Sequence, residues 1–599
     1  MPASPTDFNE AITCHQKGEL NQAEKLYRHL LLAGPDDPRV PANLAALLAA
    51  TGRHGEAINV LTDALQRLPH SAVLLRHRAR LYWASAQQEA AIRDLRAALS
   101  VCSNEVQDLM DLGWWLRTLS QAGLALPFIE RAVAIAPESW MAWMRLAVIL
   151  HECGRTPEAL SAIEKSFRLA PEVPAIRLNA SILFLQAHQL DRAWFWIEPL
   201  VVSGQPARNH LHQAGRCLQA LGKLEDARKL FDRCIEMNPS LFDAHANAAV
   251  CSQELGELSD AERRFRVGLA VCADVARLHH NLGYLMLLQG RFRDALSEIR
   301  WRWQSDGLAS PLPSELLELP DDDGCLLTLW SEQGVGDQLL MALLLSHPLL
   351  DHCRLRVQVD RRLIPLLKPV LPGIEWIPSD QQLVPQASGW LCSLLELPCF
   401  LFDNLDDLSR AHPLAWLQSP SSAIRHPLAT DREGQPSSRI GISWSSANPV
   451  LGLDKSIPVS TLSQVLQRAS RQHPELTFVD LQYGEVKSDQ ERLAADLGSA
   501  YSNSPEVDKT SDFVALRTLL QGCDYVLTIS NVTAHLAGSL GLKTWLLLSP
   551  GVAGLWYWHH RDQHGHSLWY PSVRVLPKEC RVDDWSPVLG TALNQICDD

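Results

Sequence analysis

The chain has 599 residues, of which 46% are hydrophobic and 20% charged, and its formal net charge is −14. That length predicts several domains, and the composition is too apolar for a largely disordered chain. The acidic balance argues against non-specific nucleic-acid binding and against a basic helix on a membrane surface. The 14 cysteines include no CxxC pair, which favours reduced, mostly buried thiols over a disulfide framework.

The beginning of the chain has neither a basic stretch nor an apolar one. No apolar run reaches the roughly 18–20 residues that a membrane-spanning helix needs. We therefore expect a soluble, cytoplasmic protein without a signal peptide or a transmembrane segment.

The first half consists of one 34-residue unit that recurs nine times. An alanine returns at every 34th position from Ala23 to Ala295, with a small residue twelve positions before it and a large one four positions after it. Glycine recurs five positions before the alanine, and proline twelve positions after it. Small residues let two antiparallel helices approach, the large residue fills the gap between repeats, glycine turns the chain and proline starts the next unit. Period and pattern resemble the tetratricopeptide repeat, which predicts a helical superhelix with a concave groove over about residues 4–305.

A polar residue lies fourteen positions before each alanine, and six of these residues carry an amide: Asn9, Asn43, Asn179, Gln213, Asn247 and Asn281. An amide both donates and accepts hydrogen bonds, which suits the backbone of an extended peptide. The pattern resembles the asparagine ladder in the repeats of O-GlcNAc transferase and implies an acceptor peptide in the groove. The alternative stays open that asparagine is common at this repeat position without contacting anything. His77, Asp111 and Arg145 interrupt the series, so a peptide would use its two ends.

After a linker at residues 306–324, short apolar runs alternate with helical patterns. Strands are expected at Leu326–Ser331, Leu355–Asp360, Ile374–Ile377, Arg439–Ser445, Thr477–Gln482, Tyr525–Ser530 and Thr544–Leu548. The alternation predicts two Rossmann-like, doubly wound α/β halves, at residues 325–430 and 437–599, separated by a polar stretch at about Ser419–Ser438. A ligand crevice is expected between the halves, at the carboxyl ends of the strands. The acidic run Asp321–Asp323 is expected to be a solvated turn rather than a metal site.

Four segments that follow predicted strands carry the candidate donor-binding residues: Gly334, Gly336 and Asp337; Ser443, Ser445 and Lys455; Gln482 and Glu485; and Ser530, Asn531, Val532, Thr533 and His535. Glycines allow a ligand to approach closely, a lysine neutralises a diphosphate, and the N–H groups at a helix start bind phosphate. Other interpretations remain for single residues. Asp337 fits a helix N-cap, Lys455 an ordinary surface lysine, and Gln482 and Glu485 solvated loop positions.

The order of these motifs resembles a known family. Glu332–Asp337 is similar to the Glu-Gln-Gly-Leu-Gly-Asp element of bacterial repeat-fused glycosyltransferases, which are related to the heptosyltransferases of glycosyltransferase family nine. The further matching segments follow in the family's order: Ile440–Trp444 with Lys455 and Ser456, Leu481–Gly484, Ser530–Gly541 and Ser567–Pro571. The resemblance covers nearly the whole chain and implies a GT-B catalytic domain. Repeats joined to such a domain are also similar to O-GlcNAc transferase.

By this resemblance Asp337 is the base for the acceptor hydroxyl, Lys455 contacts the diphosphate, and His535 is a reserve base next to the donor sugar. The resemblance implies inverting, metal-independent transfer from a nucleotide-diphosphate sugar, with no cofactor, to a polypeptide held by the repeats. Ser530 stands where the family has aspartate, and Tyr557 stands in the Trp556–Trp558 segment where the family has arginine.

Two other functions remain open: a peptide-binding adaptor with a decayed catalytic domain, and an enzyme that glycosylates a lipid or polysaccharide. The sequence does not fix the nucleotide, the sugar or the acceptor, and a homodimer through the repeats stays open.

Overall fold

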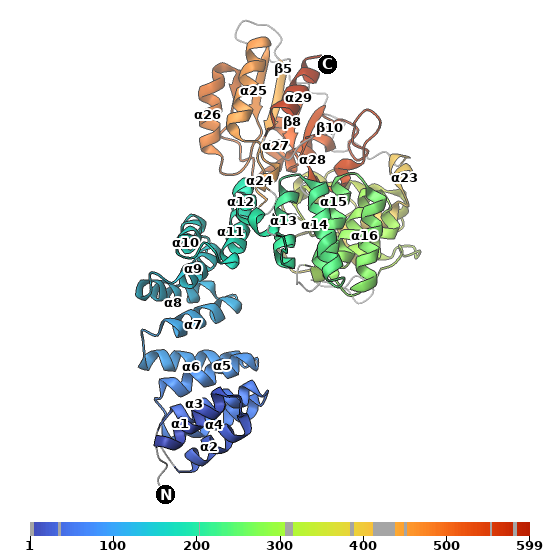
Figure 1. Ribbon diagram of the computed structural model, residues 1–599. Coiled ribbons are helices and arrows are strands. Elements are labelled where there is room, and N and C mark those ends of the chain that lie inside the picture. Colours follow the sequence, from blue (N-terminus) through green and yellow to red (C-terminus); the bar gives the residue numbers. More distant parts are fainter. Residues whose placement is uncertain are drawn as a thin grey trace. The chain divides into compact units, whose positions relative to one another are not determined.

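The computed structural model describes residues 5–33, 37–202, 204–305, 316–383, 389–410, 438–448, 452–551, 554–578 and 584–598. Most of the predicted linker and of the polar stretch at about residues 419–438 lies outside these residues. The contacts within the chain divide it into two compact units, Met1–Cys217 and Leu218–Asp599 (Figure 1). The predicted domain boundaries stay predictions.

The first unit is entirely helical in its described residues. Its helices are α1 (Pro5–Gln16), α2 (Leu20–Leu32), α3 (Arg39–Ala50), α4 (His54–Arg67), α5 (Ala72–Ala84), α6 (Gln88–Val101), α7 (Val106–Thr118), α8 (Ala122–Ile135), α9 (Trp140–Glu152), α10 (Thr156–Leu169), α11 (Pro174–Gln186) and α12 (Leu190–Val202). Helix α13 (Arg208–Ala220) spans the boundary between the units.

The second unit begins with further helices of the same pattern: α14 (Leu224–Met237), α15 (Phe242–Glu254), α16 (Leu258–Val271), α17 (Ala276–Leu288), α18 (Phe292–Ile299) and the short α19 (Arg302–Ser305). All nine repeat alanines are fully buried, and the large residues four positions later are buried too. This confirms the expected helical repeats.

The turn inside each repeat requires a left-handed backbone. Six of the nine turn positions carry glycine with φ between 71° and 80°. The other three are Ala86, Ser120 and His188, and they adopt the same conformation with φ of 58°, 59° and 55°. Glycine makes this conformation inexpensive but does not create it, because the geometry of the turn persists where glycine is replaced.

The small and large repeat positions pack against each other within one repeat. A Cβ on Gly113 would lie 2.6 Å from Ile129 Cδ1, and a Cβ on Gly283 would lie 2.6 Å from the Ile299 backbone nitrogen. At these two repeats the large residue therefore fills the space between the two helices of its own repeat. The expectation that it fills the gap between neighbouring repeats stays a prediction, to which the structure adds this contact within the repeat.

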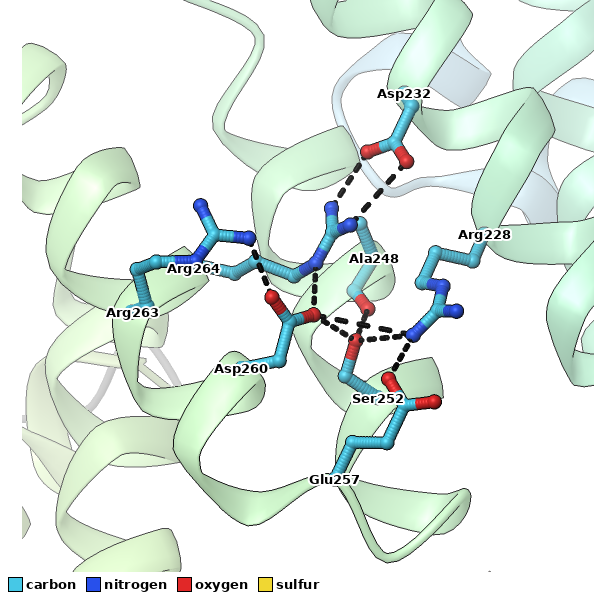
Figure 2. Close-up of polar contacts among 8 residues, drawn as sticks. All are labelled: Arg228, Asp232, Ala248, Ser252, Glu257, Asp260, Arg263 and Arg264. Carbon is cyan, nitrogen blue, oxygen red and sulfur yellow. Dashed lines mark hydrogen bonds and ion pairs between the residues drawn. The ribbon is translucent and has the colours of Figure 1, made fainter.

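Ion pairs join the stacked helices α14 and α16 (Figure 2). Arg264 reaches Asp232 on α14 at 2.6 Å and also pairs with Asp260 on its own helix, while Arg228 on α14 pairs with Glu257. Burial alone would raise the pKa of Asp260, but the hydrogen bonds from Arg264 and its neighbours hold it well below the ordinary range. Partly exposed pairs of this kind add little stability each, so the apolar packing of the helices dominates.

Two parallel sheets follow the repeats. The first has the order β3-β2-β1-β4, formed by β1 (Leu326–Trp330), β2 (Arg354–Val359), β3 (Glu375–Pro378) and β4 (Trp390–Ser393). The second has the order β10-β9-β8-β5-β6-β7, formed by β5 (Ser438–Ser443), β6 (Leu476–Asp480), β7 (Tyr501–Ser502), β8 (Tyr525–Ile529), β9 (Thr544–Leu548) and β10 (Val573–Pro577). The helices described between and after the strands are α20 (Val335–Ala342), α21 (Ile364–Leu367), α22 (Leu397–Leu401), α23 (Leu405–Arg410), α24 (Gly452–Lys455), α25 (Val459–Gln472), α26 (Lys487–Leu497), α27 (Phe513–Gln521), α28 (Val532–Ser539) and α29 (Ser586–Asp598).

The last repeat packs directly on the α/β region within the second unit. Phe292 on α18 lies edge-on to Trp556 and Trp569, and the Leu287 carbonyl accepts a hydrogen bond from His560 Nε2 at 2.9 Å. One continuous apolar core runs from Ala246 in the repeats to Val575 in β10. A helical repeat region thus continues into a region of parallel sheets without a break in the core. Among the described residues, none of the helices combines the length and the apolar character needed to cross a membrane.

Candidate functional site

The candidate residues lie where the strand order of each sheet reverses. In the first sheet β1 stands between β2 and β4, and in the second β5 stands between β6 and β8. Connections leave in opposite directions on the two sides of such a point, which opens a crevice at the carboxyl ends of the strands. Asp337 follows β1, Lys455 follows β5 and His535 follows β8.

Asp337 sits in the first turn of α20 and is held by two donors. Tyr557 Oη donates to Asp337 Oδ1 at 2.7 Å, and the Gly334 N–H donates to Oδ2 at 3.1 Å. Burial raises the pKa of Asp337, whereas the Tyr557 hydrogen bond and the positive charge of Lys455 lower it. The N-cap of α20 is Gly334, so the alternative interpretation of Asp337 as the N-cap is not met: Asp337 is the third residue of the helix, and its carboxylate accepts from the N-cap N–H as part of a wider polar cluster.

His535 occupies the first turn of α28 and is almost fully buried. Its Nδ1 lies 3.1 Å from Tyr570 Oη, and its Nε2 lies 3.4 Å from Tyr557 Oη. Burial, with a smaller contribution from Lys455, lowers the pKa of His535 to about 3, so the ring is neutral at pH 7. Both ring nitrogens of His535 have a hydrogen-bond partner if Tyr570 donates to Nδ1 and Nε2–H donates to Tyr557. Tyr557 in turn donates to Asp337. The result is one hydrogen-bonded chain that links the two sheets.

Gly336 makes the contact between α20 and α28 possible. A Cβ at this position would lie 2.5 Å from His535 Cδ2 and 2.9 Å from Nε2. The glycine therefore brings the first turn of α20 against the imidazole, and a side chain here would force the two helices apart. Gly334, at the start of the same turn, is exposed to solvent.

Lys455 ends α24 and is 5% exposed. Burial lowers its pKa, and the negative charge of Asp337 offsets part of that change. Within the part of the chain that the structure describes, its amine has no ion-pair partner within 4.0 Å. Lys455 is therefore not an ordinary surface lysine, because an almost buried cation with no close counter-ion costs free energy unless an anion binds.

The start of α28 is capped by its own chain. Asn531 Oδ1 accepts from the Thr533 N–H at 3.0 Å and from the Ala534 N–H at 3.4 Å, and the Val532 N–H faces the Tyr483 hydroxyl. These N–H groups were expected to be available for phosphate, and in the structure they are taken. The Thr533 hydroxyl, by contrast, is buried and has no hydrogen-bond partner among the described residues.

Gln482 holds the ends of two strands together instead of facing a ligand. Its Oε1 accepts from the Trp444 N–H and the Ser445 N–H, both at 2.8 Å, and from the Ser443 hydroxyl at 3.1 Å. Its Nε2 donates to the Ser445 and Tyr483 carbonyls. The amide has no group left for a donor ligand, and the structure thereby corrects the expectation that Gln482 binds the donor. Glu485 lies exposed in the next turn, in the solvated position that its alternative described.

The two positions that depart from the family pattern are filled by aromatic contacts. The Trp558 indole N–H donates to Ser530 Oγ at 3.0 Å, and Tyr557 occupies the place next to Asp337. The roles of Tyr557 and Tyr570 could not be predicted, although Tyr570 lies in a segment that resembles the glycosyltransferase pattern and Tyr557 stands where that pattern has arginine. Only the fold brings their hydroxyls next to the His535 ring.

The amide side chains of the repeats differ in how far they are exposed to solvent. Asn9 is exposed, Asn43, Asn179 and Asn281 are half-buried, and Gln213 and Asn247 are buried. Asn179 Nδ2 donates to the Ala175 carbonyl of its own helix at 2.8 Å, Gln213 Nε2 donates to Ser181 Oγ, and Asn247 Oδ1 accepts from Arg277. The buried amides stabilise the repeats themselves, so they do not form a uniform ladder. The series also crosses the boundary between the two units.

Comparisons with known proteins support the repeats. A family model described as tetratricopeptide repeat matches residues 16–72 and 110–174, and a second model with the same description matches residues 211–241. The chain is also similar to Protein FlbA of Caulobacter vibrioides, with 23% identity over 575 residues, 93% of this chain and 83% of that protein.

Two solved structures are similar to parts of the chain. A tetratricopeptide repeat protein from Parabacteroides merdae has 19% identity and a TM-score of 0.34, and the match covers 41% of this chain and 96% of that one. The protein pilF of Pseudomonas aeruginosa has 18% identity and a TM-score of 0.31, over 34% of this chain and 94% of that one. Tetratricopeptide repeats form the N-terminal region of this chain, and a region with parallel sheets follows them.

Proposed function

We propose that the α/β region is a glycosyltransferase of the GT-B type, which moves a sugar from a nucleotide-diphosphate donor to a polypeptide selected by the repeats. One observation carries the proposal: Asp337, Lys455 and His535 come from the strand ends of two different parallel sheets and interact with one another. A base, a cation and a buried polar chain at the switch points are the groups that sugar transfer from a diphosphate needs.

In this proposal Lys455 binds the donor diphosphate and stabilises the charge that grows on it as the glycosidic bond breaks. Asp337 takes the proton from the acceptor hydroxyl, since its raised pKa makes it a better base than an ordinary aspartate. His535 is a weaker candidate for the base, because both of its ring nitrogens are engaged and its pKa is about 3. It fits a positioning role, in which it holds Tyr557 against Asp337.

Nucleotide binding tests the proposal without knowledge of the acceptor. We expect one nucleoside diphosphate, or its sugar, to raise the thermal stability of the second unit. The stabilisation is about 2.7 kcal/mol at a hundred times the dissociation constant. Lys455→Met should abolish this stabilisation, while Lys487→Met should keep it, because the Lys487 side chain is 89% exposed. A panel in which Lys455→Met binds as well as the wild type would exclude Lys455 from the donor site.

Without ligand, Lys455→Met should have a higher thermal stability than the wild type. The folded-state pKa of Lys455 is lowered, so at pH values below its ordinary pKa the charged amine destabilises the folded protein. Lys455→Met is therefore expected to melt at a higher temperature than the wild type when no nucleotide is present. An unchanged or lower melting temperature would show that the amine is solvated in the folded state.

Tyr557→Phe tests the assignment of the base through the pH dependence of transfer. The Tyr557 hydroxyl donates to the Asp337 carboxylate and stabilises its charged form, so its loss raises the pKa of Asp337 further. The deprotonated base then needs a higher pH, and the acid limb of the pH–rate profile should move to higher pH. If the acid limb stays in place, a group other than Asp337 is the base.

An adaptor with a decayed catalytic domain is the second candidate. The Asn531 cap on α28, Ser530 bonded to Trp558, and Tyr557 in place of arginine favour it. The tetratricopeptide repeats support protein-partner binding in either case. If none of the nucleotides binds to well-folded protein, the adaptor becomes the better account, and peptide binding by the repeats is the next measurement.

A further inference from the structure

Two cysteines and a histidine meet at the start of the first sheet, away from the candidate donor site. Cys325 precedes β1, and His352 and Cys353 precede β2. The two Sγ atoms lie 3.0 Å apart, and Cys353 Sγ lies 3.5 Å from His352 Nε2. One ligand atom from each of the three residues lies within 4.8 Å of the others, and all three side chains are partly buried. Both cysteines are free thiols.

The parallel register of the strands creates this cluster. Leu326 pairs with Arg354, so the residues just before them stand side by side on neighbouring strands. The Gly324 N–H donates to the His352 carbonyl at 2.8 Å, and the Arg354 N–H donates to the Cys325 carbonyl at 2.8 Å. Nε2 of the His352 ring also lies 2.6 Å from the Pro320 carbonyl oxygen, which fixes the imidazole beside the sulfurs.

We propose that Cys325, His352 and Cys353 bind a thiophilic divalent metal ion of the Zn²⁺ type. Two thiolates and one imidazole form the donor set that tetrahedral zinc prefers, and a solvent molecule completes the fourth position of this partly exposed site. Binding releases the two thiol protons to solvent and moves the ring proton of His352 from Nε2 to Nδ1, so that Nε2 gives up its hydrogen bond to the Pro320 carbonyl. Two metal–sulfur bonds and one metal–nitrogen bond form, with no change of oxidation state. A disulfide between the cysteines would need an external oxidant.

The cluster of Cys325, His352 and Cys353 lies at the opposite end of β1 from Asp337, the proposed catalytic base. Asp337 follows the carboxyl end of β1, whereas Cys325 precedes its amino end, so the five residues of the strand lie between them. The exposed carboxylates of Asp321–Asp323 are next to Cys325 in sequence and add negative charge where a cation would bind. The metal therefore has a structural role, in which it ties the amino ends of β1 and β2 together, and it is independent of the proposed donor site.

Cobalt substitution tests the site directly. The full-length protein, reduced and freed of metal by a chelator, is titrated with Co²⁺, whose bound thiolates give a charge-transfer band in the near ultraviolet and whose tetrahedral geometry gives intense visible bands. We expect both sets of bands to saturate at one Co²⁺ per chain and to disappear when Zn²⁺ is added. Cys325→Ser and Cys353→Ser should each lose the saturating bands, and His352→Gln should keep the sulfur band with altered visible bands.

Cys102→Ser is the matched control, because Cys102 is an exposed free cysteine in the first unit. It should bind Co²⁺ like the wild type. The proposal is overturned if the wild type shows no saturating bands, or if the bands survive both Cys325→Ser and Cys353→Ser. It is also overturned if protein purified without reductant is two hydrogens lighter in intact mass and Cys353→Ser removes that difference, since the pair would then be a disulfide. Circular dichroism of each variant separates loss of metal from loss of fold.

Discussion

Asp337→Asn is expected to lower the rate of sugar transfer by about 10²–10⁴-fold, the range over which a positioned general base contributes, without weakening nucleotide binding. The substitution keeps the shape of the side chain and its capacity to accept the Tyr557 hydrogen bond, but it removes the basic carboxylate. The measurement is turnover with the nucleotide sugar that the binding panel identifies, together with the affinity for that nucleotide. A fall in kcat with unchanged affinity assigns Asp337 to the chemical step.

Asp406→Asn is the control for this change. Asp406 is an exposed aspartate in the first turn of α23, in the same part of the second unit. Its removal changes the net charge by the same amount but touches none of the polar chain around His535. Equal turnover of Asp337→Asn and wild type would remove Asp337 from the mechanism. A loss of nucleotide affinity in Asp337→Asn would show instead that the carboxylate orders Lys455.

The repeats could be predicted in detail because their determinants are local and occur nine times. Each helix pair is specified by a small residue, a large residue and a turn that lie within one 34-residue unit, so single exceptions do not hide the pattern. Ala86, Ser120 and His188 lack the turn glycine, and the chain still turns there. The direction of the contact between the small and large residues was not predictable, because spacing along the sequence does not say which neighbouring helix a side chain meets.

The strands that could be predicted are apolar runs. Among the described strands, β4, β7 and β10 were missed; β4 and β7 are short, but β10 has five residues, as β9 has, so length does not account for it. The predicted Thr544–Leu548 coincides with β9, whereas β4 and β7 are four and two residues long. The sequence indicates that the strands are parallel but not that β1 and β5 are the switch strands. That order depends on which strands exchange hydrogen bonds, and it decides where a ligand crevice is expected.

The candidate site was predictable only as a set of residues at strand ends. Asp337 and His535 are joined through Tyr557, and Tyr557 and Tyr570 come from a distant aromatic segment; the charge of Lys455 lowers the pKa of both groups. Polarity alone also suggested a ligand-binding role for Gln482, but all the hydrogen-bonding groups of its amide bond within the protein. The proposed metal cluster could not be predicted from the sequence either, because its cysteines are far apart in the chain and only strand pairing brings them together.

The glutamate of the glycine-loop motif has a structural partner rather than a ligand. Glu332 pairs with Arg302, and Arg302 also reaches Glu396 at 3.2 Å. Arg302 and Glu332 are each 5% exposed in their side chains, and Glu396 is 1% exposed. The arginine follows the last repeat, so this cluster joins the end of the repeats to the loop that carries Asp337.

Arg302→Met is therefore expected to destabilise the second unit by about 3–5 kcal/mol, the cost of leaving a buried ion pair without one partner. The methionine preserves much of the volume of the arginine stem, so the loss comes mainly from the carboxylates that Arg302 contacted, Glu332 more than Glu396, because Glu396 keeps its ion pair with Arg300 at 3.0 Å. The double variant Arg302→Met with Glu332→Gln should recover part of the loss, because one of these charges is then gone. Amide hydrogen exchange of peptides from β1 and α22 measures the effect inside the second unit, where a single unfolding transition of the whole chain would not resolve it.

Arg293 supplies the matched control, because its ion pair with Asp403 also joins the last repeat to the α/β region but is 63% exposed on both sides. Arg293→Met should change stability by less than about 1 kcal/mol, as exposed pairs do. If the amide hydrogens of β1 and α22 exchange at the wild-type rate in both arginine variants, the buried carboxylates are solvated or protonated in the folded protein. If Arg302→Met alone speeds exchange in β1, the end of the repeats holds the glycine loop in place, and the position of Asp337 depends on the repeat region as well as on its own sheet.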